Sequence, residues 1–319
     1  MPVVLSHESS LRYWLTGGEE ARSIEPDWSR NLSSASGNMR DIKHAGLPFA
    51  YSKHEKLHVL VGDHSSTRNQ LMVVTHRWTR PTPPESFYEC GEYCLVCSPE
   101  FTFLQLADSR TVLELILIGT YLCAGFSITE NGAFSELCTP ATTPARLESY
   151  LACSSGARGV AKARRALRHV APGTASPMEI LLCLAFTLPK SLGGWGYPEA
   201  RANEELDVPQ HLRGPLGSRT LRCDLYFPSV KGDVEYDSAE FHSDAERLDY
   251  TQTRRNVLEA MGIRTISATK SQLRGYERFN DFMWMAIERL GLPWVPPSGA
   301  TQAKQRELYG FLAGYHALF

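Results

Sequence analysis

The second half of this chain is organised around residues 219–237, which read RTLRCDLYFPSVKGDVEYD. Their composition predicts β-strands over 219–227 and 233–237, joined by a turn through Pro228 and Lys231-Gly232. Because side chains alternate across a strand, Glu235 and Asp237 share one face, and Asp224 shares a face with Arg222. A hairpin brings these polar faces together, so three carboxylates are expected to meet at one place.

The flanking sequence predicts an α/β arrangement around this hairpin. A helix over 180–188 is introduced by Ser176-Pro177, and a long helix over 244–261 is closed by Gly262. A strand over 263–268 and a helix over 279–290 follow. The order of helix, strand pair, helix and strand is typical of the α/β class.

Converging carboxylates beside apolar strands repel one another, and their burial costs several kcal/mol unless a positive charge compensates. A hard divalent cation is the usual compensation, and oxygen ligands suit Mg²⁺. Such an ion can hold a phosphate and lower the pKa of its bound water. The alternative is that these acids form only the polar outer face of a hairpin.

Several motifs, taken in order, resemble the very-short-patch-repair-like endonucleases of the PD-(D/E)XK, or restriction-endonuclease-like, superfamily. They are Ser-Pro-x-Glu at the start of a helix, Asp224, Glu235-x-Asp237 with His242, a helix ending Leu258-x-x-x-Gly262, and the closing strand. The resemblance covers about 155–275. It implies a mixed central sheet flanked by helices and Mg²⁺-dependent (or Mn²⁺-dependent) cleavage of DNA.

The resemblance also implies roles for single residues. Asp224 and Glu235 would be metal ligands, Glu179 a helix-borne acid that completes the site, and His242 a general acid or base. Two alternatives stay open: Ser176-x-x-Glu179 is also a capping box, and His242 is equally typical of a surface loop.

The chain departs from the superfamily pattern at two positions. Asp237 stands where the superfamily has a lysine that orients and activates the attacking water, and we interpret it as a further ligand or base. Ser238 stands where relatives often have glycine. An inactive, DNA-binding descendant of the fold is therefore the principal alternative, for instance a regulator or an antitoxin.

Basic residues predict where DNA would be held. Arg158, Lys162 and Arg165 form one stripe of a helix, and Arg254 lies on the helix after the acidic hairpin. A solvated helix face explains the stripe equally well. Arg254 could instead brace an acid or form an ion pair within its own helix.

Length and composition place these features in a two-domain protein. The chain has 319 residues, 43% hydrophobic and 21% charged, and a net charge of −2, so any nucleic-acid surface must be a local patch. Residues 129–145 look like a linker, which predicts a smaller α+β domain over 1–145 and the nuclease domain over 146–319. In the first domain we expect strands over 57–60, 71–74 and 93–96 and helices starting near 98 and 111.

The first domain carries no sharp motif. It weakly resembles regions joined to nucleases in bacterial abortive-infection and toxin–antitoxin-type proteins, which implies target recognition or a protein partner. No signal peptide is evident and the apolar run 115–128 is too short to span a bilayer, so we expect a cytoplasmic protein without a membrane partner.

The cysteines of this domain suggest a second alternative, a cysteine-ligated metalloenzyme. Cys90, Cys94 and Cys97 have the spacing of an iron–sulfur loop, or of zinc ligands with His76 as the fourth. Buried free thiols are the interpretation that we favour.

Overall fold

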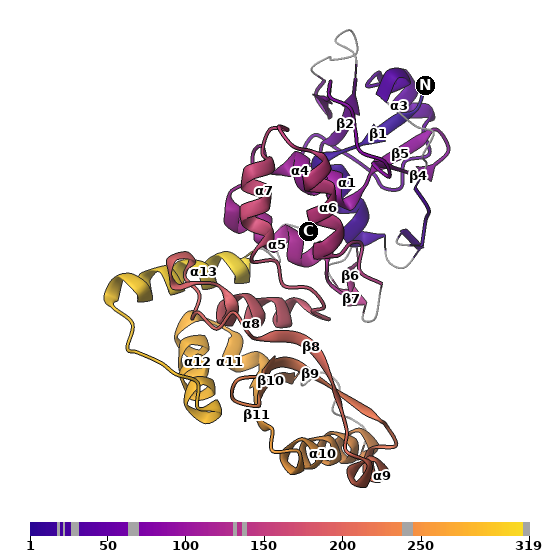
Figure 1. Ribbon diagram of the computed structural model, residues 1–319. Coiled ribbons are helices and arrows are strands. Elements are labelled where there is room, and N and C mark those ends of the chain that lie inside the picture. The colour runs from indigo at the N-terminus through magenta and orange to yellow at the C-terminus, as the bar shows by residue number, and fades with distance from the viewer. Residues whose placement is uncertain are drawn as a thin grey trace. The chain divides into compact units, whose positions relative to one another are not determined.

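The computed structural model describes residues 1–17, 20–21, 23–26, 32–62, 70–129, 133–135, 139–237 and 245–314 (Figure 1). The chain divides into two compact units, the first ending at Pro172 and the second beginning at Gly173. Both units combine helices with mixed β-sheets, so the protein is of the mixed α and β class that the sequence predicts. None of the described helices is long and apolar enough to cross a membrane.

The first unit is built on a five-stranded sheet with the strand order β3-β2-β1-β5-β4. Its central strand, β1 (Val3–Leu5), is entirely buried and pairs antiparallel with β2 (Leu57–Val61) and parallel with β5 (Cys94–Cys97). The edges are β3 (Val73–Arg77), parallel to β2, and β4 (Phe87–Gly91), antiparallel to β5. The expected strands are thus β2, β3 and β5, whereas β1 and β4 were not predicted.

Helices pack beside this sheet and against one another. Ser98 caps α4 (Pro99–Leu106), where its Oγ accepts a hydrogen bond from the amide of Phe101 at 3.1 Å. Thr111 and Glu114 form a capping box at the start of α5, whose apolar surface is buried on nearly all sides. The remaining elements of the unit are α1 (His7–Thr16), η1 (Leu32–Ser34), α3 (Met39–His44), α5 (Val112–Leu122), β6 (Ser127–Ile128), β7 (Phe134–Ser135), α6 (Pro144–Cys153) and α7 (Val160–Leu167).

The boundary between the units lies later than residue 145, where the sequence placed it. Helix α6 packs against α4, and α7 packs against α5 and α6, so both helices belong to the first unit. The segment before α6 is also fixed to this unit, because buried Thr142 donates its hydroxyl to Glu100 at 2.5 Å and its amide to the carbonyl of Leu122 at 3.1 Å.

The second unit contains a four-stranded mixed sheet with the order β11-β10-β9-β8. Strand β9 (Thr220–Phe227) pairs antiparallel with both β8 (Arg201–Asp207) and β10 (Gly232–Asp237). Strand β11 (Arg264–Thr269) runs parallel to β10. The parallel pair is connected through α10 (Ala245–Ala260), as a parallel pair requires a crossover. The strands predicted over 219–227, 233–237 and 263–268 are β9, β10 and β11.

Apolar side chains hold helices on this sheet. Val257 and Leu258 of α10 share a buried cluster with Leu221 and Cys223 of β9. Gly232 begins β10 close to the side chain of Leu290, where a Cβ atom would lie 3.1 Å away, so a larger residue would require Leu290 to shift. The other elements are α8 (Pro177–Thr187), η3 (Lys190–Leu192), η4 (Gln210–Leu212), α9 (Arg213–Leu216), α11 (Lys270–Leu273), α12 (Tyr276–Leu290) and α13 (Gly299–Gly314).

Candidate functional site

The β9–β10 hairpin brings Asp224 and Glu235 together, as the sequence predicts. The two strands pair antiparallel from Gly232 opposite Phe227 to Val234 opposite Leu225, so the next pair of residues is Asp224 and Glu235. Beyond that point the carboxylate of Asp224 takes the place of a backbone acceptor, since its Oδ2 accepts a hydrogen bond from the amide of Tyr236 at 2.8 Å. The backbone pairing of the two strands therefore ends next to the position where Asp224 and Glu235 lie opposite each other.

Arg254 of α10 closes the site from one side. Its guanidinium forms an ion pair with Glu235 and also donates to the backbone carbonyl of Arg222. The side chains of Arg254 and Glu235 are only 19% and 12% exposed, so the pair is shielded from solvent. Arg254 lies one turn before Leu258, whose packing on the sheet fixes the helix that carries it. The structure thus assigns Arg254 to bracing an acid, one of the roles left open by the sequence.

Asp233 is a buried acid that sequence reasoning missed. It is 0% exposed, and its carboxylate lies beside the carboxylate of Glu235 and the thiol of Cys223. Burial raises its pKa well above the usual range, and the neighbouring charges of Glu235 and Asp224 raise it further. The signal was present in the sequence, because Asp233, Glu235 and Asp237 follow the period of two that places side chains on one face of a strand.

Glu179 caps helix α8 and also lies near Asp224. In the first turn of α8, its carboxylate accepts hydrogen bonds from the Ala175 amide at 2.7 Å and the Ser176 hydroxyl at 3.0 Å, which completes the cap of the helix. Asn203 of β8 donates a third hydrogen bond at 2.6 Å. The same carboxylate is close enough to Asp224 to be the largest charge acting on it. Glu179 is therefore a fixed acid beside the hairpin as well as a structural cap.

Repulsion among neighbouring carboxylates dominates the electrostatics of the cluster. Burial, followed by the charges of Glu179 and Glu235, raises the pKa of Asp224 to about 7, against the opposing effects of the Tyr236 amide and Arg254. Burial opposes the charge of the Arg254 guanidinium, but Glu235, Asp224 and Asp233 together raise its pKa. One guanidinium thus faces three acids, with Glu179 as a fourth acid beside Asp224, so at neutral pH part of the cluster holds protons.

Most of the donor groups in the cluster are carboxylate oxygens, the ligands that hard divalent cations prefer. Glu179, Asp224, Asp233 and Glu235 contribute these oxygens, and the thiol of Cys223 lies beside Asp233 and Glu235. The carboxylate oxygens do not converge closely enough to coordinate one ion together, however. No three of the carboxylate oxygens of Glu179, Asp224, Asp233 and Glu235 lie within 4.8 Å of one another.

Other expected site residues lie elsewhere. Asp237 ends β10, opposite Thr269 of β11. His242 and Ser238 fall outside the described residues. Arg158, Lys162 and Arg165 belong to the first unit and not to the unit with the acids. There Arg158 pairs with Asp108 at 2.5 Å, while Lys162 donates to the carbonyls of Asp108 and Arg110 at 3.3 and 2.8 Å. Arg165 is exposed on α7.

The cysteines at 90, 94 and 97 do not form a metal site with His76. The sulfurs of Cys90 and Cys94 lie 3.3 Å apart, but Cys97 is engaged by the side-chain amide of Gln105 at 3.4 Å. Across the described ranges, the one group of three or more potential ligands that lies close enough for a metal ion is Glu8, His58 and His76. His76 thus belongs to a different cluster from the one expected.

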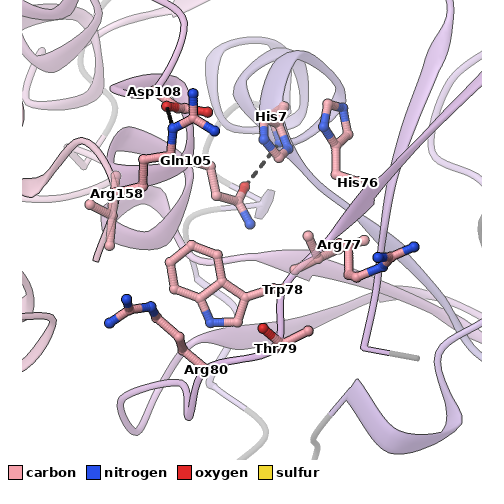
Figure 2. Close-up of a pocket in the computed structure, with 11 residues that line it drawn as sticks. His7, His76, Arg77, Trp78, Thr79, Arg80, Gln105, Asp108 and Arg158 are labelled. Carbon is pink, nitrogen blue, oxygen red and sulfur yellow. Dashed lines mark hydrogen bonds and ion pairs between the residues drawn. The ribbon is translucent and has the colours of Figure 1, made fainter. Parts of the chain in front are cut away.

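The first unit also contains a cavity of about 270 Å³ (Figure 2). Its lining includes His7, His76 and the side chains of Arg77, Trp78 and Arg80, together with Arg158 in its ion pair with Asp108. Figure 2 shows His7 hydrogen-bonded to Gln105 and the ring of Trp78 beneath them. The residues around this cavity carry more positive than negative side chains, which favours an anionic occupant.

Comparisons of the chain with protein-family models, with curated proteins and with solved structures found no match. The functional interpretation therefore depends on the geometry of this chain and on the chemistry of its side chains.

Proposed function

We propose that the second unit is a divalent-metal-dependent endodeoxyribonuclease, with its site on Asp224 and Glu235. The observation that carries the proposal is the partly buried Asp224 beside Glu179 and Glu235: desolvation and then the charges of these two acids raise its pKa to about 7. A protein stabilises such a cluster poorly without a cation, and perturbed acids of this kind are concentrated at functional sites. The mixed sheet flanked by helices is compatible with the restriction-endonuclease-like fold that the motifs resemble.

In this proposal Asp224 and Glu235 hold Mg²⁺ or Mn²⁺, with Glu179 and Asp237 as supporting acids. When bound, such an ion would lower the pKa of the attacking water and stabilise the negative charge that develops on the phosphate. Asp224 would give up its proton when a cation binds, so a raised pKa is compatible with a metal ligand at this position. His242 is the proposed group for proton transfer, and Arg165 of the first unit is the proposed contact to the DNA backbone.

Arg254 supports a second candidate, an inactive DNA-binding protein that keeps the fold. The guanidinium already satisfies the charge of Glu235, and Asp237 replaces the lysine of active relatives in the superfamily. The carboxylate oxygens also lie too far apart to bind one cation together unless the side chains rearrange. The two candidates differ in turnover and not in binding.

A cleavage assay distinguishes them. The purified protein is incubated with plasmid, single-stranded and mismatched DNA in Mg²⁺, Mn²⁺ or EDTA, beside Asp224→Ala and the control Asp207→Asn, which changes an exposed acid of β8. The nuclease proposal expects metal-dependent cutting by the parent and the control, with at least about a 100-fold loss in Asp224→Ala. Shifts in gel mobility without cutting on any substrate would instead support the inactive binder.

A further inference from the structure

A group of potential metal ligands lies in the first unit, remote in sequence from the acidic hairpin. Glu8 is in the first turn of α1, His58 is on β2 and His76 is on β3. Strands β2 and β3 are parallel, with Leu60 opposite His76, so the two histidines share one face of the sheet at diagonal positions. Three elements that meet at one sheet face therefore supply one ligand group each.

The ligand atoms of these residues converge. The Nδ1 atom of His58 lies 2.9 Å from Oε2 of Glu8 and 2.9 Å from Nε2 of His76, and all three atoms lie within 4.8 Å of one another. A single proton on Nδ1 cannot form two straight hydrogen bonds to two acceptors. A cation, in contrast, accepts all three lone pairs at once.

Surrounding contacts fix the orientation of each ligand. Arg110 holds the other carboxylate oxygen of Glu8 at 2.9 Å, which leaves Oε2 directed at the histidines. The ring of His7 stacks on that of His76 with 3.5 Å between centroids, and the backbone amide of His58 donates to Ser9 at 2.8 Å. Partners of this kind, outside the ligands themselves, orient the ligands of protein metal sites.

The backbone at the start of α1 is also held in an uncommon conformation. His7 has a φ of +48°, in the region that residues other than glycine rarely adopt, and its amide donates to the side chain of Gln105 at 3.1 Å. Such strain persists where surrounding structure imposes it, and it is concentrated at functional sites. Here it precedes the ligand Glu8 directly.

We propose that Glu8, His58 and His76 form a binding site for a divalent transition-metal ion, best matched by Zn²⁺. Two imidazole nitrogens and one carboxylate oxygen are a set that Zn²⁺ accepts with a fourth position for water or a ligand. Mg²⁺ prefers oxygen ligands, so this site and the proposed site on Asp224 select different ions. The proposal does not depend on nuclease activity.

The test is Zn²⁺ binding by the full chain, free of any histidine tag and stripped with EDTA. Titration calorimetry gives the stoichiometry, and Co²⁺ added in place of Zn²⁺ reports coordination through its visible absorption. We expect one Zn²⁺ at this site, with affinity reduced at least about 100-fold in His58→Ala and His76→Ala. Matched controls are His54→Ala, an exposed histidine of the same unit, and Cys90→Ser, and both are expected to bind as the parent does.

Folding is checked by circular dichroism for every variant. Should a histidine variant fail to fold, Glu8→Gln gives the same test, because the amide keeps the shape of the side chain and removes the anionic ligand. Absence of Zn²⁺ binding by the folded parent would overturn the proposal. So would unchanged affinity in folded His76→Ala or Glu8→Gln, or equal loss in Cys90→Ser.

Discussion

Asp224→Asn is expected to stabilise the metal-free protein at neutral and alkaline pH while abolishing its activity. The folded state raises the pKa of Asp224 from 3.8 to about 7, so the folded protein binds a proton more tightly than the unfolded chain between these values. The free energy of unfolding therefore falls as the pH rises from about 4 to about 7. A shift of about 3 units at about 1.4 kcal/mol each gives a fall on the order of 4 kcal/mol.

Asparagine cannot ionise, so the variant escapes this loss. Its Oδ1 can still accept the hydrogen bond from the amide of Tyr236, which keeps the local geometry. The difference in unfolding free energy, variant minus parent, is expected to rise from near zero at pH 4 towards about 4 kcal/mol at pH 8. Glu179, Glu235 and Asp233 share the repulsion with Asp224, and Arg254 relieves part of it, so this value is a ceiling.

The assay is urea unfolding in EDTA at a series of pH values, for the parent, Asp224→Asn and Asp207→Asn. The exposed Asp207 control should follow the parent throughout. Added Mg²⁺ should raise the stability of the parent at pH 8 and leave Asp224→Asn unchanged. A difference between Asp224→Asn and the parent that is constant with pH, or destabilisation of the variant at pH 8, would refute the raised pKa of Asp224 in the folded protein.

Three further substitutions test the neighbours of this acid. Arg254→Gln leaves Glu235 without its buried partner, so it should destabilise the metal-free protein by about 3 kcal/mol in urea unfolding, and an unchanged midpoint would contradict the pairing. Glu179→Gln removes the largest charge acting on Asp224, so NMR titration of labelled carboxyl carbons should show a lowered Asp224 pKa. An unchanged pKa would show that the charge of Glu179 does not act on Asp224. Arg165→Ala should reduce the slope of log binding constant against log salt for DNA by about 1, and an identical slope would remove this exposed residue from the interface.

The sequence predicted strands that alternate polar and apolar residues or contain a short apolar run, but it missed β8 and β1. Strand β9 was found because buried and accessible residues alternate along it. Strand β8 reads RANEELD and lies at the sheet edge, where polar side chains on both faces carry no apolar signal. Strand β1 has three residues, and its central place depends on pairing with β5, which is distant in the sequence.

The candidate site shows the same limit. Asp224 and Glu235 were predictable because a short hairpin fixes their register. The partner of Arg254 was not, since it depends on how α10 lies on the sheet and not on spacing within the helix. Glu8, His58 and His76 carry no local pattern at all, because three separate elements bring them together. Likewise, the packing of α7 on α5 assigns the basic stripe to the first unit, which its sequence does not reveal.

The most direct test of the central claim is the rate at which parent and Asp224→Asn proteins nick plasmid DNA in Mg²⁺. The two are compared at equal concentration and at a pH where both are folded. We predict nicking by the parent that EDTA abolishes, and a rate at least about 100-fold lower in the stabilised variant. Equal rates for the two proteins, or a folded parent that binds DNA without cutting it in Mg²⁺ or Mn²⁺, would contradict a metal-dependent nuclease centred on Asp224.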